Sequence, residues 1–340
     1  MNTKISRPLL FLLLLTSTLL MQACATPDSD SSLQDHEKRF RQKVAYTTHM
    51  VEREGYRIHA REYGADNPGP VFIMMHGFPD NMHLYDWLIP ELAAKRRIIT
   101  FDFLGWGESD KPRGHLYDVS SLRQDLQAVI EYFRLEQVVP VVHDASGQPG
   151  IDWALENPGK TAGLVLLNTY YGPMPTLKAP EEIAVFSTPG LQRELAIQAT
   201  RFSPTLWLRR YKAQIGKFIS TEALRQPVQE LFAQQSLAIR PAFYGLNGVL
   251  RQEVEKRAAK TTQLQAFQPP VRIIFGKDDP YLNAGVAKEF HKLFPHSELY
   301  LLEDAGHFVQ IDKPRQVARL MADFPASQTS TTLSTTRSTK

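Results

Sequence analysis

The stretch Val138-Val139-Pro140-Val141-Val142-His143-Asp144-Ala145-Ser146-Gly147-Gln148-Pro149-Gly150 decides the fold of this chain. A β-branched run ends in a cluster of polar and very small residues, and a helical pattern then begins. Strand, abrupt turn and helix are the setting of a nucleophile elbow, in which a strained turn lifts one side chain above a parallel sheet. Small residues are required there because the backbone is crowded around the apex of the turn.

Two side chains compete for the apex, Asp144 and Ser146. With Asp144 at the apex, Val142 lies two residues before it and Ser146 two residues after it. With Ser146 at the apex, Asp144 and Gln148 occupy the places where the turn needs glycine-sized groups. The crowding argument therefore favours Asp144. A carboxylate at this point could also simply cap the helix that follows.

The segment His143-Asp144-Ala145-Ser146-Gly147 resembles the His-Asp-Trp-Gly-Gly elbow of epoxide hydrolases and haloalkane dehalogenases. Both are α/β-hydrolases with an aspartate nucleophile. The similarity covers residues 45 to 325 and is weakest between 172 and 268. It continues in the same order through His76-Gly77-Phe78-Pro79, Phe101-Asp102-Phe103-Leu104-Gly105-Trp106-Gly107-Glu108-Ser109-Asp110-Lys111-Pro112, Gly276-Lys277-Asp278-Asp279-Pro280 and Gly306-His307-Phe308.

The pattern of apolar runs predicts a doubly wound, mostly parallel α/β sheet. Continuously apolar runs such as 71–75 and 164–167 suit strands buried on both faces, and helical patterns lie between them. The alternation stops after residue 169, and the resemblance implies a helical cap inserted there. We expect the first part of an α/β-hydrolase core at 44–169, the cap at 170–268, the second part of the core at 269–325, and a disordered Ser/Thr-rich tail at 326–340.

The N-terminus has the features of a lipoprotein signal peptide. Lys4 and Arg7 precede an apolar run, and small residues surround Cys24, so residues 1–23 are expected to be removed. The sequence before Cys24 resembles a bacterial lipobox, which implies that Cys24 is acylated and that 24–43 is a flexible tether. We expect an exported protein anchored in the bacterial cell envelope, at the periplasmic face or outer membrane. The alternative is a secreted or soluble periplasmic protein in which Cys24 has no role.

Composition limits the possible partners. The formal net charge is +3 and no compact Lys/Arg run is present, so nucleic-acid binding has no electrostatic basis. We expect no metal, because no cluster of ligand residues has metal-binding spacing. We expect no organic cofactor either, because a glycine-rich phosphate loop is missing. The expected partners are a small-molecule substrate and, through Cys24, a membrane.

Three acidic or basic residues follow three expected strands. Asp144 follows the run at 138–142, Asp279 follows 271–275, and His307 follows 299–302. Function sits at the carboxyl ends of the strands in such sheets, and nucleophile, acid, histidine is the chain order of α/β-hydrolases.

Each of the three has an expected role. Asp144 would attack a substrate carbon to give an alkyl-enzyme ester, and His307 would activate the water that cleaves this ester. Asp279 would orient His307. The neighbouring Asp278 is the alternative, although the resembled families place the acid directly before the proline.

Stabilisation of a negative oxygen requires fixed donors, and the backbone N–H groups of Phe78 and Ala145 are the candidates. His76 is expected to be a buried orienting residue. The residues expected to stabilise loops near the site are Asp102, Trp106, Glu108 and Asp110.

The resemblance breaks at positions that bind the leaving group. Dehalogenases hold the departing halide with a tryptophan after the nucleophile, where this chain has Ala145, and Phe78 replaces an asparagine. Epoxide hydrolases use two cap tyrosines as proton donors. The tyrosines available for that role are Tyr170, Tyr171, Tyr211 and Tyr244.

Three functions therefore stay open. The first is a hydrolase that attacks a small apolar electrophile through Asp144, in the manner of an epoxide hydrolase or a haloalkane dehalogenase. The second is an ester or lactone hydrolase that uses Ser146. The third is a non-catalytic binding protein that keeps the cap pocket.

Overall fold

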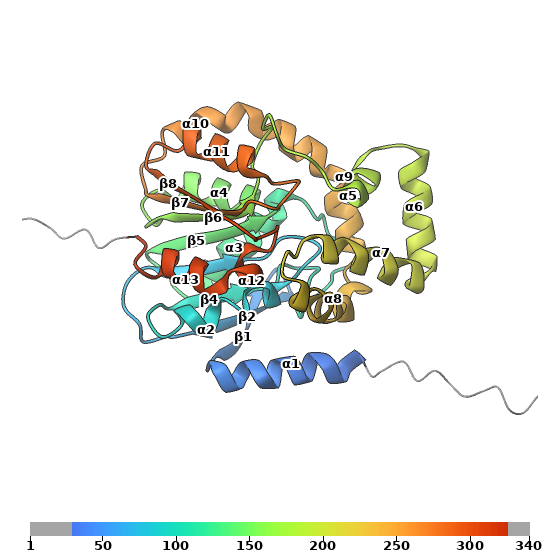
Figure 1. Ribbon diagram of the computed structural model, residues 1–340, viewed down its shortest axis with the longest axis horizontal. Helices are drawn as coiled ribbons and strands as arrows, with labels where there is room; N and C mark the ends of the chain where they lie inside the picture. Colours follow the sequence, from blue (N-terminus) through green and yellow to red (C-terminus); the bar gives the residue numbers. More distant parts are fainter. Residues whose placement is uncertain (1–28, 326–340) are drawn as a thin grey trace, which may run out of the picture.

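A computed structural model describes residues 29–325 of the chain. Its centre is an eight-stranded sheet with the order β1-β2-β4-β3-β5-β6-β7-β8 (Figure 1). β1 pairs with β2, and β2 with β4, in antiparallel fashion, and all other pairs are parallel. The strands are β1 (Thr47–Arg53), β2 (Tyr56–Tyr63), β3 (Val71–Met75), β4 (Ile98–Phe101), β5 (Val138–Asp144), β6 (Leu164–Thr169), β7 (Val271–Gly276) and β8 (Ser297–Leu302).

The interior strands consist of residues that are buried on both faces. Every residue of β3, β4 and β6 is buried, as expected for apolar strands that helices cover on both sides. β1 and β2 alternate more, and their hairpin turns at Glu54 and Gly55, both with positive φ. The predicted doubly wound, mostly parallel sheet is therefore confirmed.

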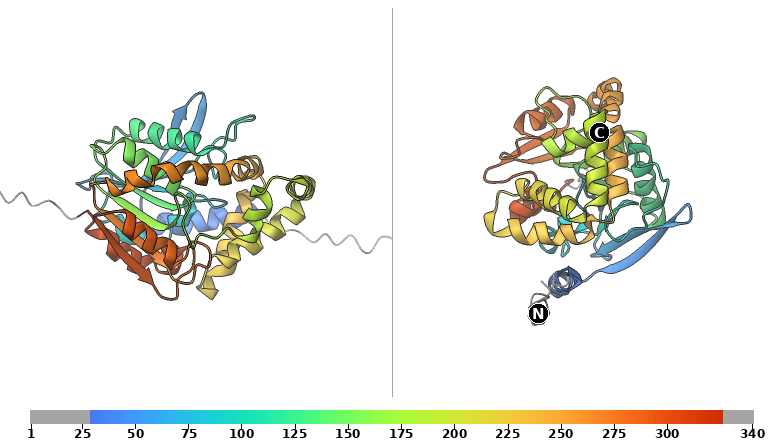
Figure 2. Two further views of the ribbon diagram at one scale, coloured as in Figure 1. Left: turned by 90° about the horizontal axis from the view of Figure 1, so that it is seen from above. Right: turned by 90° about the vertical axis from the view of Figure 1, so that its right-hand side faces the viewer.

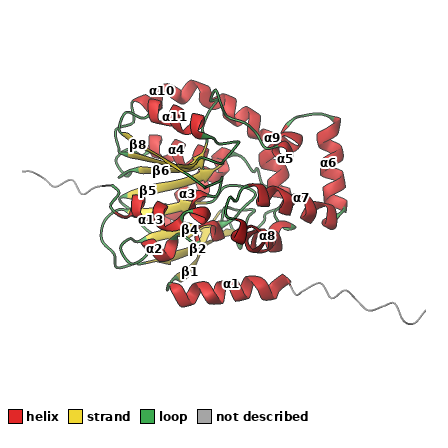
Figure 3. Ribbon diagram, viewed as in Figure 1, coloured by secondary structure: helices red, strands yellow, loops and turns green. Residues whose placement is uncertain are grey.

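Helices cover both faces of the sheet (Figures 2 and 3). α3 and α4 pack together on one face, where α4 contacts β5 and β6. α12 contacts β6 and β7 on the other face, where α13 packs on α2. The helices of this core are η1 (Met82–Tyr85), α2 (Ile89–Leu92), α3 (Val119–Tyr132), α4 (Gly147–Glu156), α11 (Ala284–Leu293), α12 (Val309–Asp312) and α13 (Pro314–Ala322).

The segment between β6 and β7 forms a helical cap. Most of it lies beyond one end of the strands, on the right in Figure 1, while the short helix α10 lies over the core and contacts α11. This arrangement has the strand–cap–strand order that the sequence indicated. The helices of the segment are α5 (Glu181–Ser187), α6 (Leu191–Phe202), α7 (Pro204–Lys217), α8 (Glu222–Ser236), α9 (Arg240–Lys256), η2 (Arg257–Lys260) and α10 (Thr261–Gln265).

The structure differs from the expected flexible tether, because Ser29–Lys43 forms the helix α1. Phe40 is only 3% exposed, and its ring packs against Tyr46 and Tyr63. Glu37 pairs with Arg61 of β2, and the Nε2 atom of His36 lies 2.8 Å from Asp86 Oδ2. α1 also contacts the cap helix α8. Tertiary contacts therefore order a segment that has little hydrophobic periodicity of its own.

Some expectations lie outside the described residues. They are the signal peptide at 1–23, the lipidation site Cys24 and the tail at 326–340. Within residues 29–325, every helix is too short or too polar to cross a bilayer.

Replacing Phe40 with alanine should test the docking of α1. We expect the free energy of unfolding to fall by about 3 kcal/mol, because a buried aromatic ring is lost and a cavity is left. Chemical denaturation of the purified protein measures the change. Lys38→Ala, on the exposed side of the same helix, is the control and should leave stability nearly unchanged. Equal stability of the two variants would show that α1 is not docked through Phe40.

Candidate active site

The turn after β5 has the geometry of a nucleophile elbow, with Asp144 at its apex. Asp144 has φ +49°, a backbone conformation that a residue with a side chain rarely adopts. A Cβ on Gly77 would lie 2.5 Å from Asp144 Cβ, and one on Gly147 would lie 2.0 Å from Thr169 Oγ1. The hydroxyl of Thr169 donates to the Asp144 carbonyl at 2.6 Å. Gly77, which packs against the turn, and Gly147, which directly follows it, therefore leave no space for a side chain.

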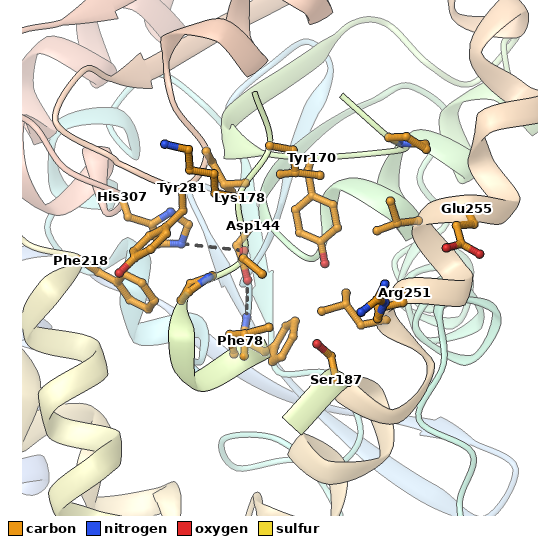
Figure 4. A pocket seen from close by; sticks show the side chains of 18 residues that line it. Phe78, Asp144, Tyr170, Lys178, Ser187, Phe218, Arg251, Glu255, Tyr281 and His307 are labelled. Atoms are coloured by element: carbon orange, nitrogen blue, oxygen red, sulfur yellow. Dashed lines mark hydrogen bonds and ion pairs between the residues drawn. The ribbon is translucent and has the colours of Figure 1, made fainter. Parts of the chain in front are cut away.

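Asp144, Asp279 and His307 come together at the carboxyl ends of three strands. Figure 4 shows Asp144 and His307. The distance from His307 Nδ1 to Asp279 Oδ2 is 2.7 Å, and the distance from His307 Nε2 to Asp144 Oδ1 is 3.9 Å. The backbone N–H of Phe78 donates to Asp144 Oδ2 at 3.1 Å. One carboxylate oxygen thus faces His307 while the other is held by the backbone. Asp278 is exposed and lies near Ser220 instead.

Asn168 supports this arrangement, and no sequence motif indicated it. It stands near the end of β6 with φ +26°, and its Nδ2 donates to Asp279 Oδ2 at 3.0 Å. Its Oδ1 accepts from the N–H of Gly276 at 2.8 Å. The other oxygen of Asp279 accepts from the N–H groups of Tyr281 and Leu282. These hydrogen bonds orient the carboxylate of Asp279 independently of its contact with His307.

Burial and mutual attraction set the pKa values of the three groups. Burial raises the pKa of Asp144 to about 6, although attraction to His307 opposes the shift. Burial acts to lower the pKa of His307, but Asp279 and Asp144 outweigh it, so this pKa is raised. Burial also acts against ionised Asp279, yet His307 lowers the pKa of its carboxyl. An ionised Asp279 beside a readily protonated His307 is the pattern of an acid that orients a base.

Ser146 is turned away from this group. It is 1% exposed, and its Oγ lies 3.0 Å from the Met75 carbonyl and 2.7 Å from the His143 carbonyl. The ring of His143 donates through Nε2 to the His307 carbonyl at 3.0 Å. The Ser146 hydroxyl is thus bonded inside the elbow instead of contacting His307.

The other motif residues stabilise the loops around the elbow. His76 accepts the N–H of Phe103 at 3.1 Å and lies 2.6 Å from the Gly77 carbonyl, so it orients the backbone next to Phe78. Asp102 accepts the N–H groups of Met82 and Glu108, each at 2.9 Å. Trp106 is buried. Asp110 accepts the N–H of Arg57 at 2.9 Å.

A mostly apolar cavity of about 360 Å³ opens between the core and the cap (Figure 4). Asp144 and His307 line it together with Phe78 and Phe218. Charged and exposed side chains also line it, namely Lys178, Arg251 and Glu255. A small, largely apolar molecule can therefore approach the carboxylate of Asp144.

Of the four tyrosines indicated by the sequence, the cavity lining includes Tyr170 alone. The buried hydroxyl of Tyr170 makes no hydrogen bond to any described residue. The other three hydroxyls are bonded elsewhere: Tyr171 to Asp152 at 2.6 Å, Tyr211 to the Pro79 carbonyl at 2.7 Å, and Tyr244 to Thr200 at 2.9 Å. Tyr281, which the sequence analysis missed, also lines the cavity, and its position two residues after Asp279 was the available signal.

The cap is tied to the core at several points. At its start, Asn283 Nδ2 donates to the Thr176 carbonyl at 2.8 Å. In its middle, the N–H groups of Ser220 and Thr221 donate to the carboxylate of Asp312 at 3.1 and 2.8 Å. At its end, Arg257 pairs with Asp152 of α4 at 2.5 Å.

Among residues 29–325, one group has metal-ligand side chains close together. The ligand atoms of His36, His83 and Asp86 lie within 4.8 Å of one another. Both imidazoles already contact Asp86 Oδ2, at 2.8 and 2.7 Å, and none of the three residues lines the active-site cavity. This group therefore has no part in the chemistry at Asp144.

The fold and the grouping of acid, histidine and elbow define an α/β-hydrolase. The family model described as alpha/beta hydrolase fold matches residues 70–314, so the chain belongs to this family. The chain is 24% identical to bifunctional epoxide hydrolase 2 of Sus scrofa over 81% of this chain and 54% of that protein. It is 25% identical to haloalkane dehalogenase 2 of Mycobacterium tuberculosis over 77% of this chain and 89% of that protein. A solved membrane phospholipase A superposes with a TM-score of 0.71 at 17% identity, over 86% of this chain and 89% of that one.

The family assignment confirms the resemblance to α/β-hydrolases and the prediction that the protein is a hydrolase.

Asp144→Asn should make the protein more stable at neutral and alkaline pH. Burial raises the pKa of Asp144 from 3.8 to about 6, so ionisation above pH 6 costs the folded state stability. We expect the variant to gain about 1–3 kcal/mol in free energy of unfolding at pH 8 and almost nothing at pH 4. Denaturant titrations at both pH values measure this difference. The exposed Asp278→Asn is the control, and a gain that is equal at both pH values would contradict the raised pKa.

Proposed function

We propose that the protein hydrolyses a small, largely apolar electrophile through a covalent ester on Asp144. One observation carries the proposal. Asp144 presents one oxygen toward His307 and the cavity, while its other oxygen is held by the N–H of Phe78. A carboxylate held in this way is oriented for attack at carbon, and the backbone donor is in place for the step that follows.

The first step forms the ester. Asp144 Oδ1 attacks the substrate carbon, and the bond to the leaving oxygen or halide breaks with its electron pair. For an epoxide, the leaving oxygen stays attached to the product and needs a proton. The hydroxyl of Tyr170 supports this reaction, because it is buried, lines the cavity and has no partner among the described residues. Ala145 offers no indole N–H for a halide, so we favour epoxide opening.

The second step cleaves the ester. His307 Nε2 removes a proton from water, and the resulting hydroxide adds to Cγ of Asp144. The negative charge develops on Oδ2, where the N–H groups of Phe78 and Ala145 stabilise it. The bond from Cγ to Oδ1 then breaks, so the product keeps Oδ1 and Asp144 gains an oxygen from water. The proton held by His307 passes to the departing alkoxide. For an epoxide, the proton left on the regenerated carboxyl of Asp144 returns to the Tyr170 phenolate, so both groups end the cycle as they began it.

Isotope labelling tests this sequence of bonds. In water enriched in ¹⁸O, the product of a first turnover of a terminal epoxide should carry no label, and Asp144 should gain one labelled oxygen. Intact-mass and peptide mass spectrometry measure both. Label in the first product would instead mean that water attacks the substrate directly.

Three variants separate the alternatives. His307→Gln should accumulate the ester, since its hydrolysis slows by a factor of ~10²–10⁴ without the base. Asp144→Asn should form none, and Ser146→Ala should keep its turnover. Loss of turnover in Ser146→Ala with retention in Asp144→Asn would identify a serine esterase. Ligand-induced thermal stabilisation without turnover of epoxides, haloalkanes or esters would identify a binding protein.

We also propose that the protein is exported and attached to a bacterial membrane by a lipid on Cys24. The charged start, the apolar run and the residues before Cys24 support this. When the full chain is expressed in a bacterium with labelled palmitate, we expect label in the wild type and none in Cys24→Ala, which should become soluble. An unlabelled, soluble wild type would contradict the proposal.

A further inference from the structure

The cap helix α6 carries apolar side chains on the side that faces solvent. Leu191, Leu195 and Phe202 are 76%, 60% and 80% exposed. At 3.6 residues per turn, the three positions fall within about 40° of one another around the helix axis. We call them the α6 stripe. The exposed Gln198 lies between Leu195 and Phe202 on this side of the helix. Three large apolar side chains that share one exposed side of a helix favour a surface that binds a partner.

The opposite side of α6 already has its packing partners. Ile197 is 5% exposed, and the buried Thr200 bonds to Tyr244 of α9. α6 also packs against α5 and α7. The outer position of the helix is visible in Figure 2, where α6 crosses the face turned toward the viewer in the right-hand view. The α6 stripe is therefore not needed to hold the cap together.

Two exposed cations belong to α6 and to the helix that follows it, Arg201 to α6 and Arg209 to α7. Arg201 and Arg209 are exposed, and neither guanidinium makes a hydrogen bond or an ion pair to another residue in the described range. In a twofold pairing of two copies through α6, these like charges would be brought close together. An apolar stripe beside arginines instead matches acyl chains beneath negatively charged phosphates.

The start of the described chain lies on the same side of the molecule. In Figure 1 the N-terminal end of α1 is directed to the right, which is the side of the molecule on which α6 lies. The sequence that precedes α1 contains the apolar run and Cys24, only a few residues before Ser29. A membrane attached at Cys24 would thus meet the side of the protein that carries the α6 stripe.

We propose that the α6 stripe inserts shallowly into the surface of a bilayer containing anionic phospholipid. Leu191, Leu195 and Phe202 enter the interface, and Arg201 and Arg209 contact lipid phosphates. The proposal concerns a surface of the cap and does not rest on the hydrolase chemistry.

Vesicle binding tests the proposal without the lipid anchor. The protein starting at Ala25 keeps all described residues, and it contains no cysteine because Cys24 is the single one in the chain. We expect it to sediment with vesicles of phosphatidylcholine and phosphatidylglycerol, and more weakly with phosphatidylcholine alone. The triple variant Leu191→Gln, Leu195→Gln, Phe202→Gln should bind ~10-fold more weakly or worse. Its melting temperature and its turnover of a soluble substrate should be unchanged.

Leu116 provides a matched control, because it is 75% exposed but lies on the core before α3. Leu116→Gln should bind vesicles like the wild type. A second readout uses Phe202→Cys and Leu116→Cys labelled with an environment-sensitive dye. Vesicles should shift the emission of the dye to the blue at position 202 and not at 116.

Three outcomes would overturn the proposal. They are absence of vesicle binding by the wild type, equal binding by the triple variant, and equal spectral shifts at positions 116 and 202. A dimer in analytical ultracentrifugation that the triple variant loses, without vesicle binding, would assign the α6 stripe to a second copy of the chain instead.

Discussion

The backbone of one residue, Asp144, is held in a conformation that its side chain disfavours, and the site depends on it. A positive φ at a residue with a Cβ costs about 1–3 kcal/mol and persists only where its surroundings impose it. Here neighbouring residues pack tightly around the backbone of Asp144. Gly77 and Gly147 leave no room for a methyl group, and Thr169 holds the carbonyl of Asp144. The same crowding brings the N–H of Phe78 onto the carboxylate, so the strain and the donor arise together.

The sequence was sufficient to predict those strands, turns and site residues at which function or burial restricts the choice of amino acid. Strands such as β3 and β6 are buried on both faces, and their apolar runs were therefore visible. The elbow was visible because its backbone demands small residues at fixed offsets. Asp144, Asp279 and His307 could be placed from their chain order and from the resemblance to the α/β-hydrolases, since the carboxyl ends of parallel strands meet at one edge of the sheet.

The sequence was insufficient where a contact depends on how two elements meet in space. Leu33 and Phe40 of α1 are seven residues apart on one helical face, but the positions between them on that face are His36 and Glu37. These polar residues are satisfied by Asp86 and Arg61, partners distant in sequence, so α1 resembled a tether. Nothing in the sequence around Asn168 indicates its role, because its partner Gly276 is more than 100 residues away along the chain. The tyrosines could not be ranked, because the path of the loop after β6 decides where Tyr170 and Tyr171 point, and the rotations of α7 and α9 decide where Tyr211 and Tyr244 point.

The restraints on the cap determine how the cavity can respond to a molecule inside it. Hydrogen bonds and an ion pair fix the cap at its start, at the turn between α7 and α8, and at its end. Moving the whole cap away from Asp144 would therefore require all three sets of contacts to break. While these contacts persist, the cavity favours ligands that fill the space and excludes larger ones, because no binding energy is used to close the cap over them. Selectivity in such a site is a property of its shape, and enlarging it means trimming the walls instead of loosening a hinge.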